Sequence, residues 1–166
     1  RKGTHMKFTP ARIARAAAVA AMYVLLTFVF QTFSFGAIQF RVSEALMLLP
    51  VAADFAVPGL FIGCLIANLI CGGVWYDIVI GSLATLIAAI LVRRLREKTW
   101  IAAAMPAIVN GIMVGPVVYF AYVSGTGIGV LLSTIATVAL GEIAVCYMLG
   151  VPMLHLLKRL PAQVFE

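Results

Sequence analysis

The sequence predicts an all-α integral membrane protein, a bundle of six transmembrane helices, from its composition and the spacing of its apolar stretches. Hydrophobic residues make up 64% of the 166 residues and charged residues 11%, and the mean hydropathy is +1.12. These values are far more apolar than those of soluble domains. Six apolar segments follow one another along residues 6–166, which we expect to form a single membrane domain. The leader RKGTH at residues 1–5 is expected to be a cloning remnant.

The net charge of +6 does not indicate nucleic-acid binding. The basic residues come in short groups between apolar runs, where they act as topology signals, and the sequence shows no basic groove with interleaved aromatic residues. Cys64, Cys71 and Cys146 lie inside apolar segments without the close pairs that a zinc site needs. We therefore expect a lipid bilayer as the surroundings, no nucleic-acid partner and no metal.

The first segment, about Thr9 to Phe35, is long enough to span a bilayer and begins with an alanine-rich stretch. Alanines spaced four apart let a neighbouring helix approach closely, so we expect this stretch to dock onto a partner helix. The residues concerned are Ala14, Ala16, Ala17, Ala18, Ala20 and Ala21. The alternative is that alanine serves only as a good helix former and packs inside this chain.

Segments two and three, about Ser43–Ala53 and Pro58–Cys71, are shorter than the roughly 20 residues that a perpendicular span needs. We expect two tilted or incompletely spanning helices, and one long broken pass is the alternative. Ser43 is predicted to be the N-cap of the first helix and Pro50 to kink it, and Pro58 fits the first turn of the second.

Segment four, about Asp77–Leu95, follows a glycine turn at residues 72–73 and the aromatic pair Trp75 and Tyr76. Asp77 is placed to cap its first turn. The glycine-containing connections 72–73 and 125–129 are candidate lids over a bound ligand.

Segment five, about Trp100–Val123, carries Gly111 and Gly115 in the GxxxG spacing that allows tight helix contact. Segment six, about Val130–Leu157, holds Glu142 deep in the span. A charge at that depth costs about 2.5–3.5 kcal/mol on insertion scales, which favours a functional reason for its presence.

The basic residues predict the orientation. Cytoplasmic loops carry an excess of Lys and Arg, and outside the leader only Arg41 falls on the opposite side. Both termini are therefore predicted to be cytoplasmic, with the protein crossing a bacterial plasma membrane several times. The predicted cytoplasmic residues are Lys7, Arg12, Arg15, Arg93, Arg94, Arg96, Lys98, Lys158 and Arg159.

This topology collects carboxylates, amides and aromatic rings that could converge on one outward-facing cavity. Such groups suit a planar, nitrogen-rich heterocycle, because a carboxylate accepts two parallel N–H bonds and an aromatic ring stacks on the plane. The predicted binding residues are Arg41, Glu44, Asn68, Trp75, Tyr76, Asp77, Asn110, Tyr119, Tyr122 and Glu142. Simpler roles stay open: interface anchoring for Trp75 and Tyr76, capping for Asp77, pairing with Arg41 for Glu44, and pairing inside the bundle for Glu142.

No catalytic or energy-coupling motif accompanies these residues. The chain has no GxxxxGK[ST] phosphate loop, no HExxH, no GxSxG and no histidine placed as a base. A small membrane enzyme that uses Glu44, Asp77 and Glu142 as acid–base groups or metal ligands is a minor alternative. No cofactor of its own is expected, so a partner would have to supply the energy for uptake.

The runs QFRVSEAL at residues 39–46 and DIVIGSLATL at residues 77–86 resemble the QueT family of queuosine-precursor transporters. These are similar to the substrate-binding (S) components of energy-coupling factor (ECF) transporters. The resemblance implies a six-helix S component that captures a deazaguanine, such as preQ1, preQ0, queuine or queuosine, at the outer face. It also implies docking through the alanine-rich helix onto a transmembrane coupling subunit with two cytoplasmic ATPases, which would hold ATP and magnesium.

Under this resemblance, the pairing of residues with ligand groups stays open. Glu44 or Glu142 would accept the guanine-like N–H edge, Asn68 or Asn110 would complete it, Asp77 would pair with an exocyclic amine, and Trp75 or Tyr76 would stack. An S component for another vitamin, such as riboflavin or thiamine, is the alternative.

Overall fold

The computed structural model describes residues 9–34, 40–71, 74–123 and 127–159. Within these ranges the protein is helical and has no strand. The α-helices are α1 (Pro10–Val29), α2 (Gln31–Ser34), α3 (Leu49–Ala52), α4 (Ala56–Ile70), α5 (Ser82–Arg94), α6 (Thr99–Tyr122), α7 (Ile128–Val145) and α8 (Val151–Leu157). A 3-10 helix, η1 (Val42–Leu48), and two π-helices, η2 (Asp77–Gly81) and η3 (Cys146–Gly150), complete the set.

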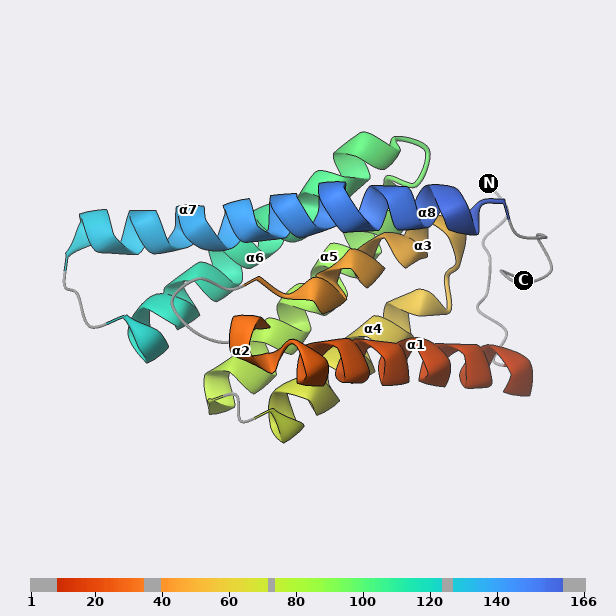
Figure 1. Ribbon diagram of the computed structural model, residues 1–166, viewed down its shortest axis with the longest axis horizontal. Helices are drawn as coiled ribbons and strands as arrows, with labels where there is room; N and C mark the ends of the chain where they lie inside the picture. The colour runs from red at the N-terminus through yellow and green to blue at the C-terminus, as the bar shows by residue number, and fades with distance from the viewer. Residues whose placement is uncertain (1–8, 35–39, 72–73, 124–126, 160–166) are drawn as a thin grey trace.

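These elements join into six successive segments: α1, η1–α3, α4, η2–α5, α6 and α7–η3–α8. Figure 1 shows that neighbouring segments run in opposite directions, so that the start of α1 and the end of α8 lie at the same end of the bundle. In the described ranges, three helices are long and apolar enough to cross a membrane, namely α1, most of α6, and the continuous Ile128–Leu157. The predicted six-segment helical bundle is confirmed in this coarser form.

Local details differ from the predictions at three places, one helix end and two expected caps. The first segment is not one helix to Phe35, because α1 stops at Val29 and the short α2 follows Phe30. Ser43 is not an N-cap, since it lies inside η1 and its hydroxyl bonds to α1. Asp77 is not at the start of its helix, because helical residues begin at Trp75.

The contact between α1 and α4 depends on small residues on both helices. A Cβ added to Gly59 would lie 2.6 Å from the carbonyl oxygen of Ala16, and one added to Gly63 would lie 3.0 Å from the Cα of Ala20. Glycine at these positions lets the two backbones approach closely. Ala16 and Ala20 therefore pack inside this chain, as the alternative interpretation of the alanine stripe expected.

The other four alanines of the stripe, Ala14, Ala17, Ala18 and Ala21, are exposed. They remain available to a partner or to lipid.

The contact between α6 and α7 follows the predicted GxxxG pattern. A Cβ on Gly115 would lie 2.8 Å from Cγ1 of Ile135, and one on Gly111 would lie 3.2 Å from the Cβ of Ala139. Between these two helix pairs lies an apolar core that includes Tyr23, Met47 and Val118.

Charged residues near the shared end of α1 and α8 hold the short helices in place. Arg12 on α1 lies 3.5 Å from Asp54, in the connection before α4. Arg93 on α5 donates from Nη1 to the carbonyl oxygen of Pro50 at 3.0 Å. Arg93 thereby supplies a donor to carbonyl groups in the last turn of α3, which have no partner within the helix.

Candidate functional site

The polar cluster begins with Arg41 and Glu44 at the start of η1. The 3-10 helix places side chains three residues apart on one side, and the backbone N–H of Glu44 donates to the carbonyl oxygen of Arg41 at 2.9 Å. Both side chains are almost fully buried, Arg41 at 5% exposure and Glu44 at 1%. A charge buried this deeply in a membrane protein requires partners, which neighbouring elements supply.

Asp77 provides the first of these partners. Its carboxylate is fully buried at the start of the π-helix η2 and lies 3.9 Å from a guanidinium nitrogen of Arg41. Arg41 thus interacts with two carboxyl groups from different elements, because the charge of Glu44 also acts on it.

Asn68 on α4 faces the same place with a defined orientation. Its Nδ2 donates to the backbone carbonyl oxygen of Asp77 at 3.2 Å and lies 3.6 Å from Sγ of Cys64. Because a backbone carbonyl can only accept, the amide nitrogen must face it. The Oδ1 atom of Asn68 is left as a buried acceptor with no hydrogen-bond partner in the described residues. We call Arg41, Glu44, Asn68 and Asp77 the Arg41 group.

Asn110 and Glu142 form a second unit, which we call the Glu142 pair. Nδ2 of Asn110, on α6, donates to Oε1 of Glu142, on α7, at 2.8 Å. The second carboxylate oxygen of Glu142 is buried and has no hydrogen-bond partner among the described residues. The charges of Glu44 and Arg41 act on Glu142, so the pair and the Arg41 group share one electrostatic environment.

Both π-helices lie against this cluster. A Cβ on Gly81, which ends η2, would lie 3.3 Å from Nδ2 of Asn68, and one on Gly150, which ends η3, would lie 3.1 Å from the carbonyl oxygen of Ala45 on η1. Single π-helical turns are frequent at functional sites. Here they bring α5 and the α7–α8 segment close to the polar residues.

The three predicted aromatic residues whose side chains are described, Trp75, Tyr76 and Tyr119, are not buried with the cluster. Trp75 is 73% exposed and makes an edge contact with the partly exposed Tyr76. Tyr119 is partly exposed, and its hydroxyl accepts from the backbone N–H of Gly127 at 3.2 Å. Tyr122 ends α6, but its side chain is outside the described part of the structure, as are residues 72–73 and 125–126 of the candidate lids.

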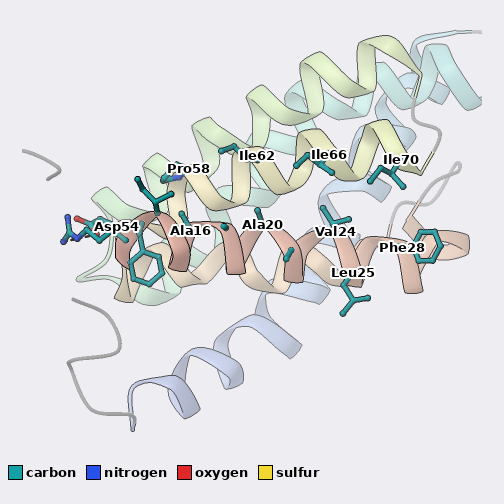
Figure 2. A pocket seen from close by; sticks show the side chains of 15 residues that line it. Ala16, Ala20, Val24, Leu25, Phe28, Asp54, Pro58, Ile62, Ile66 and Ile70 are labelled. Carbon is teal, nitrogen blue, oxygen red and sulfur yellow. Dashed lines mark ion pairs between the residues drawn. The ribbon is translucent and has the colours of Figure 1, made fainter. Parts of the chain in front are cut away.

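The two grooves that the structure describes lie on either side of α1, away from the polar cluster. Figure 2 shows the larger one, of about 740 Å³, between α1 and α4, where Ala16, Ala20 and Val24 face Ile62 and Ile66. The second groove, of about 600 Å³, lies between α1, η1 and α8. None of the predicted binding residues lines either groove, so in the described residues the polar cluster is buried away from both grooves.

Sequence reasoning missed Tyr23 and Thr27, which connect α1 to the cluster. The hydroxyl of Tyr23 donates to Oε1 of Glu44, and Oγ1 of Thr27 bonds to Oγ of Ser43 at 2.8 Å. Tyr and Thr four residues apart on an otherwise apolar helix share one face, and that spacing was the available signal.

The site offers mainly acceptors. The buried atoms without a partner in the described residues are Oε2 of Glu44, Oδ1 of Asn68 and Oε2 of Glu142. Buried polar atoms of this kind call for an explanation, and three of them beside one guanidinium suit a ligand that donates several N–H bonds. No group of three or more His, Cys, Asp or Glu side chains in the described ranges is placed to hold a metal.

Within the described residues, helices long and apolar enough to cross a membrane enclose charged side chains, a combination typical of membrane proteins with an internal polar site. The family model for the QueT transporter matches residues 13–159, and the chain belongs to this transporter family. The chain is also 39% identical over 77 residues to a protein of Lactococcus lactis subsp. cremoris (strain MG1363) named Queuosine precursor transporter QueT. That match covers 45% of this chain and 45% of the relative. No solved structure matches the chain.

Proposed function

We propose that this protein is the substrate-binding S component of an ECF-type uptake transporter in a bacterial plasma membrane, and that it binds a queuosine precursor. The observation that carries the proposal is the set of three unpaired, buried acceptors on Glu44, Asn68 and Glu142. Membership in the QueT transporter family and the name of the Lactococcus relative support the substrate class.

The chemistry of a deazaguanine matches these acceptors. Its guanine-like edge carries a ring N–H and an exocyclic amino group, which a carboxylate binds through two parallel hydrogen bonds. Oε2 of Glu44 or of Glu142 can take part in such a pair, and Oδ1 of Asn68 can accept a further N–H. Both N–H groups of Asn68 Nδ2 already have protein acceptors, the backbone oxygen of Asp77 and Sγ of Cys64, so a ligand carbonyl would have to displace the longer contact to sulfur.

Charge balance favours a cationic ligand. The cluster contains three carboxyl groups, on Glu44, Asp77 and Glu142, and one guanidinium, on Arg41. The aminomethyl group of preQ1 carries a positive charge that the nitrile of preQ0 lacks, and opposite charges in a dry site attract strongly. We therefore propose preQ1 as the preferred ligand.

The burial of the cluster residues fits tight binding of a small ligand. Nanomolar affinity corresponds to about −12 kcal/mol, which is about −1 kcal/mol per heavy atom for a ligand of roughly a dozen atoms. Only an enclosed, fully hydrogen-bonded site reaches that efficiency. The residues of the cluster are at most 6% exposed, which meets this requirement once a ligand satisfies their acceptors.

The test is calorimetric titration of the purified protein with preQ1, preQ0, guanine, riboflavin and thiamine. The proposal predicts nanomolar binding of preQ1, preQ0 binding at least about 10-fold weaker, and no binding of the two vitamins. Binding of riboflavin or thiamine in preference to every deazaguanine would contradict it.

The remaining part of the proposal concerns orientation and partners. The end of the bundle with the basic residues would face the cytoplasm, and the exposed alanines of α1 would dock onto a coupling subunit whose two ATPases hydrolyse ATP with magnesium. Ala18→Leu, which enlarges an exposed residue of α1, is then expected to keep preQ1 binding and to lose uptake in cells. Ala136→Leu, at an exposed alanine of α7, is the matched control and should keep both.

A further inference from the structure

We infer that Tyr23 is a positioning residue for ligand binding: it holds Glu44 so that one carboxylate oxygen stays bonded to α1 and the other stays free for the ligand. Tyr23 lies in the middle of α1, is 1% exposed, and donates its hydroxyl to Oε1 of Glu44. Oε2 of the same carboxylate has no partner within the described residues.

The position of the Tyr23 ring is itself fixed by packing. Its Cβ lies where α1 meets α4, because a Cβ added to Gly63 would be only 2.9 Å away. A longer side chain on α4 would push the ring aside, whereas glycine leaves room for it. This packing therefore holds the hydroxyl in a fixed position beside Glu44, as a positioning group requires.

The remaining surroundings of Glu44 cannot hold its carboxylate in the same way. The other titratable groups that act on Glu44 are Arg41, three residues before it, Cys64 on α4, Cys146 on η3 and Glu142 on α7. Arg41 is shared with Asp77, Sγ of Cys146 lies 3.7 Å from the backbone oxygen of Glu44, and the carboxyl of Glu142 is bonded to Asn110. The hydroxyl of Tyr23 is the hydrogen-bond donor that the structure places on it.

Thr27 provides a matched control on the same helix. It lies one turn beyond Tyr23, is also 1% exposed, and bonds to Ser43, the residue before Glu44. Thr27→Val removes a hydrogen bond between α1 and η1 without touching the carboxylate. A merely structural tie between the two elements would be weakened by either substitution.

The experiment compares Tyr23→Phe with Thr27→Val. In calorimetric titration with preQ1, Tyr23→Phe is expected to weaken binding about 10-fold, the size expected when a hydrogen bond to a charged group is lost. Thr27→Val should change it less than about 2-fold. Equal effects of the two substitutions would overturn the inference.

This binding readout rests on the proposed function, so a second readout uses the protein without ligand. The infrared carboxyl band that disappears in Glu44→Gln belongs to Glu44; it should shift in Tyr23→Phe and stay in place in Thr27→Val. If Tyr23→Phe does not fold, 3-fluorotyrosine at position 23, a stronger donor, should shift the same band instead. If neither Tyr23→Phe nor 3-fluorotyrosine shifts the Glu44 band, the inference is overturned. Failure of the unaltered protein to bind preQ1 would overturn the proposed function alone.

Discussion

The Arg41 group and the Glu142 pair are two buried polar units that are stabilised in different ways. In the Arg41 group, a guanidinium interacts with two carboxyl groups, and residues of α4, η1 and η2 contribute, with Tyr23 of α1 bonded to Glu44. In the Glu142 pair, one neutral amide contacts one carboxyl group, and no cation is bonded to it in the described residues. The Arg41 group therefore has an internal counter-charge that the Glu142 pair lacks, and under the proposed function a ligand would supply the missing partner of the pair.

The largest expected effect follows from removing the cation. Arg41→Met leaves Glu44 and Asp77 buried without their shared counter-charge, and breaking a buried pair in this way costs about 3–5 kcal/mol. We expect a large fall in the melting temperature in detergent.

The control is Arg12→Met, which breaks the more exposed pair with Asp54 at 3.5 Å. Pairs near the surface contribute at most about 1 kcal/mol, so its melting temperature should change little. A similar small change for Arg41→Met would show that the Arg41 group does not support the fold.

Glu142→Gln should separate binding from stability. The new side chain still accepts the hydrogen bond from Asn110, but it places an NH₂ group where Oε2 offered an acceptor. We expect preQ1 affinity to fall about 10- to 100-fold, because a hydrogen bond to a charged group is replaced by two N–H donors that face each other.

The melting temperature of ligand-free Glu142→Gln should stay the same or rise, since the substitution keeps the hydrogen bond with Asn110 and replaces a buried ionisable group with a neutral amide. A large loss of stability without ligand would mean that the Glu142 pair is as structural as the Arg41 group.

Gly63→Ala tests how the Arg41 group depends on the α1–α4 contact. The new Cβ would lie 2.9 Å from the Cβ of Tyr23, and overpacking of this kind costs about 1–3 kcal/mol. We expect lower stability together with weaker preQ1 binding, because Tyr23 is displaced from Glu44. The control is Gly129→Ala, with nothing within 4 Å of the added Cβ, which should change neither stability nor preQ1 affinity. If Gly63→Ala binds preQ1 as tightly as the unaltered protein does, the packing of Tyr23 has no influence on the site.

The smallest effect is expected at Trp75. This side chain is 73% exposed and does not contact either polar unit, so Trp75→Phe should change preQ1 affinity less than about 2-fold in calorimetric titration. A loss of 10-fold or more would restore the stacking role that the sequence left open.

The sequence predicted the number of helical segments and most of their limits, the end of α1 excepted, because apolar run length and basic clusters are strong, local signals. The runs now assigned to α6 and to Ile128–Leu157 lie within about two residues of the predicted segments. The buried polar residues were also predictable, because charges such as Arg41, Asp77 and Glu142 are rare in so apolar a chain. Their burial agrees with that expectation, while their binding role stays a proposal.

Other features depended on contacts that no local pattern encodes. The alanine stripe looks uniform in sequence, yet Ala16 and Ala20 pack against Gly59 and Gly63 while Ala17 is exposed. Trp75 and Asp77 are two residues apart, yet the helix turns one outward and the other inward. Tyr23 gave only a weak signal, because a lone tyrosine in an apolar helix usually packs in the core, and its bond to Glu44 joins residues 21 apart.

The most direct test of the whole account is an experimental structure of the protein bound to preQ1. The account predicts one preQ1 molecule enclosed between the Arg41 group and the Glu142 pair, with Oε2 of Glu44 and Oε2 of Glu142 both within hydrogen-bond distance of its nitrogen atoms. A structure in which preQ1 occupies a groove beside α1, while both carboxylate oxygens stay without a ligand contact, would contradict it.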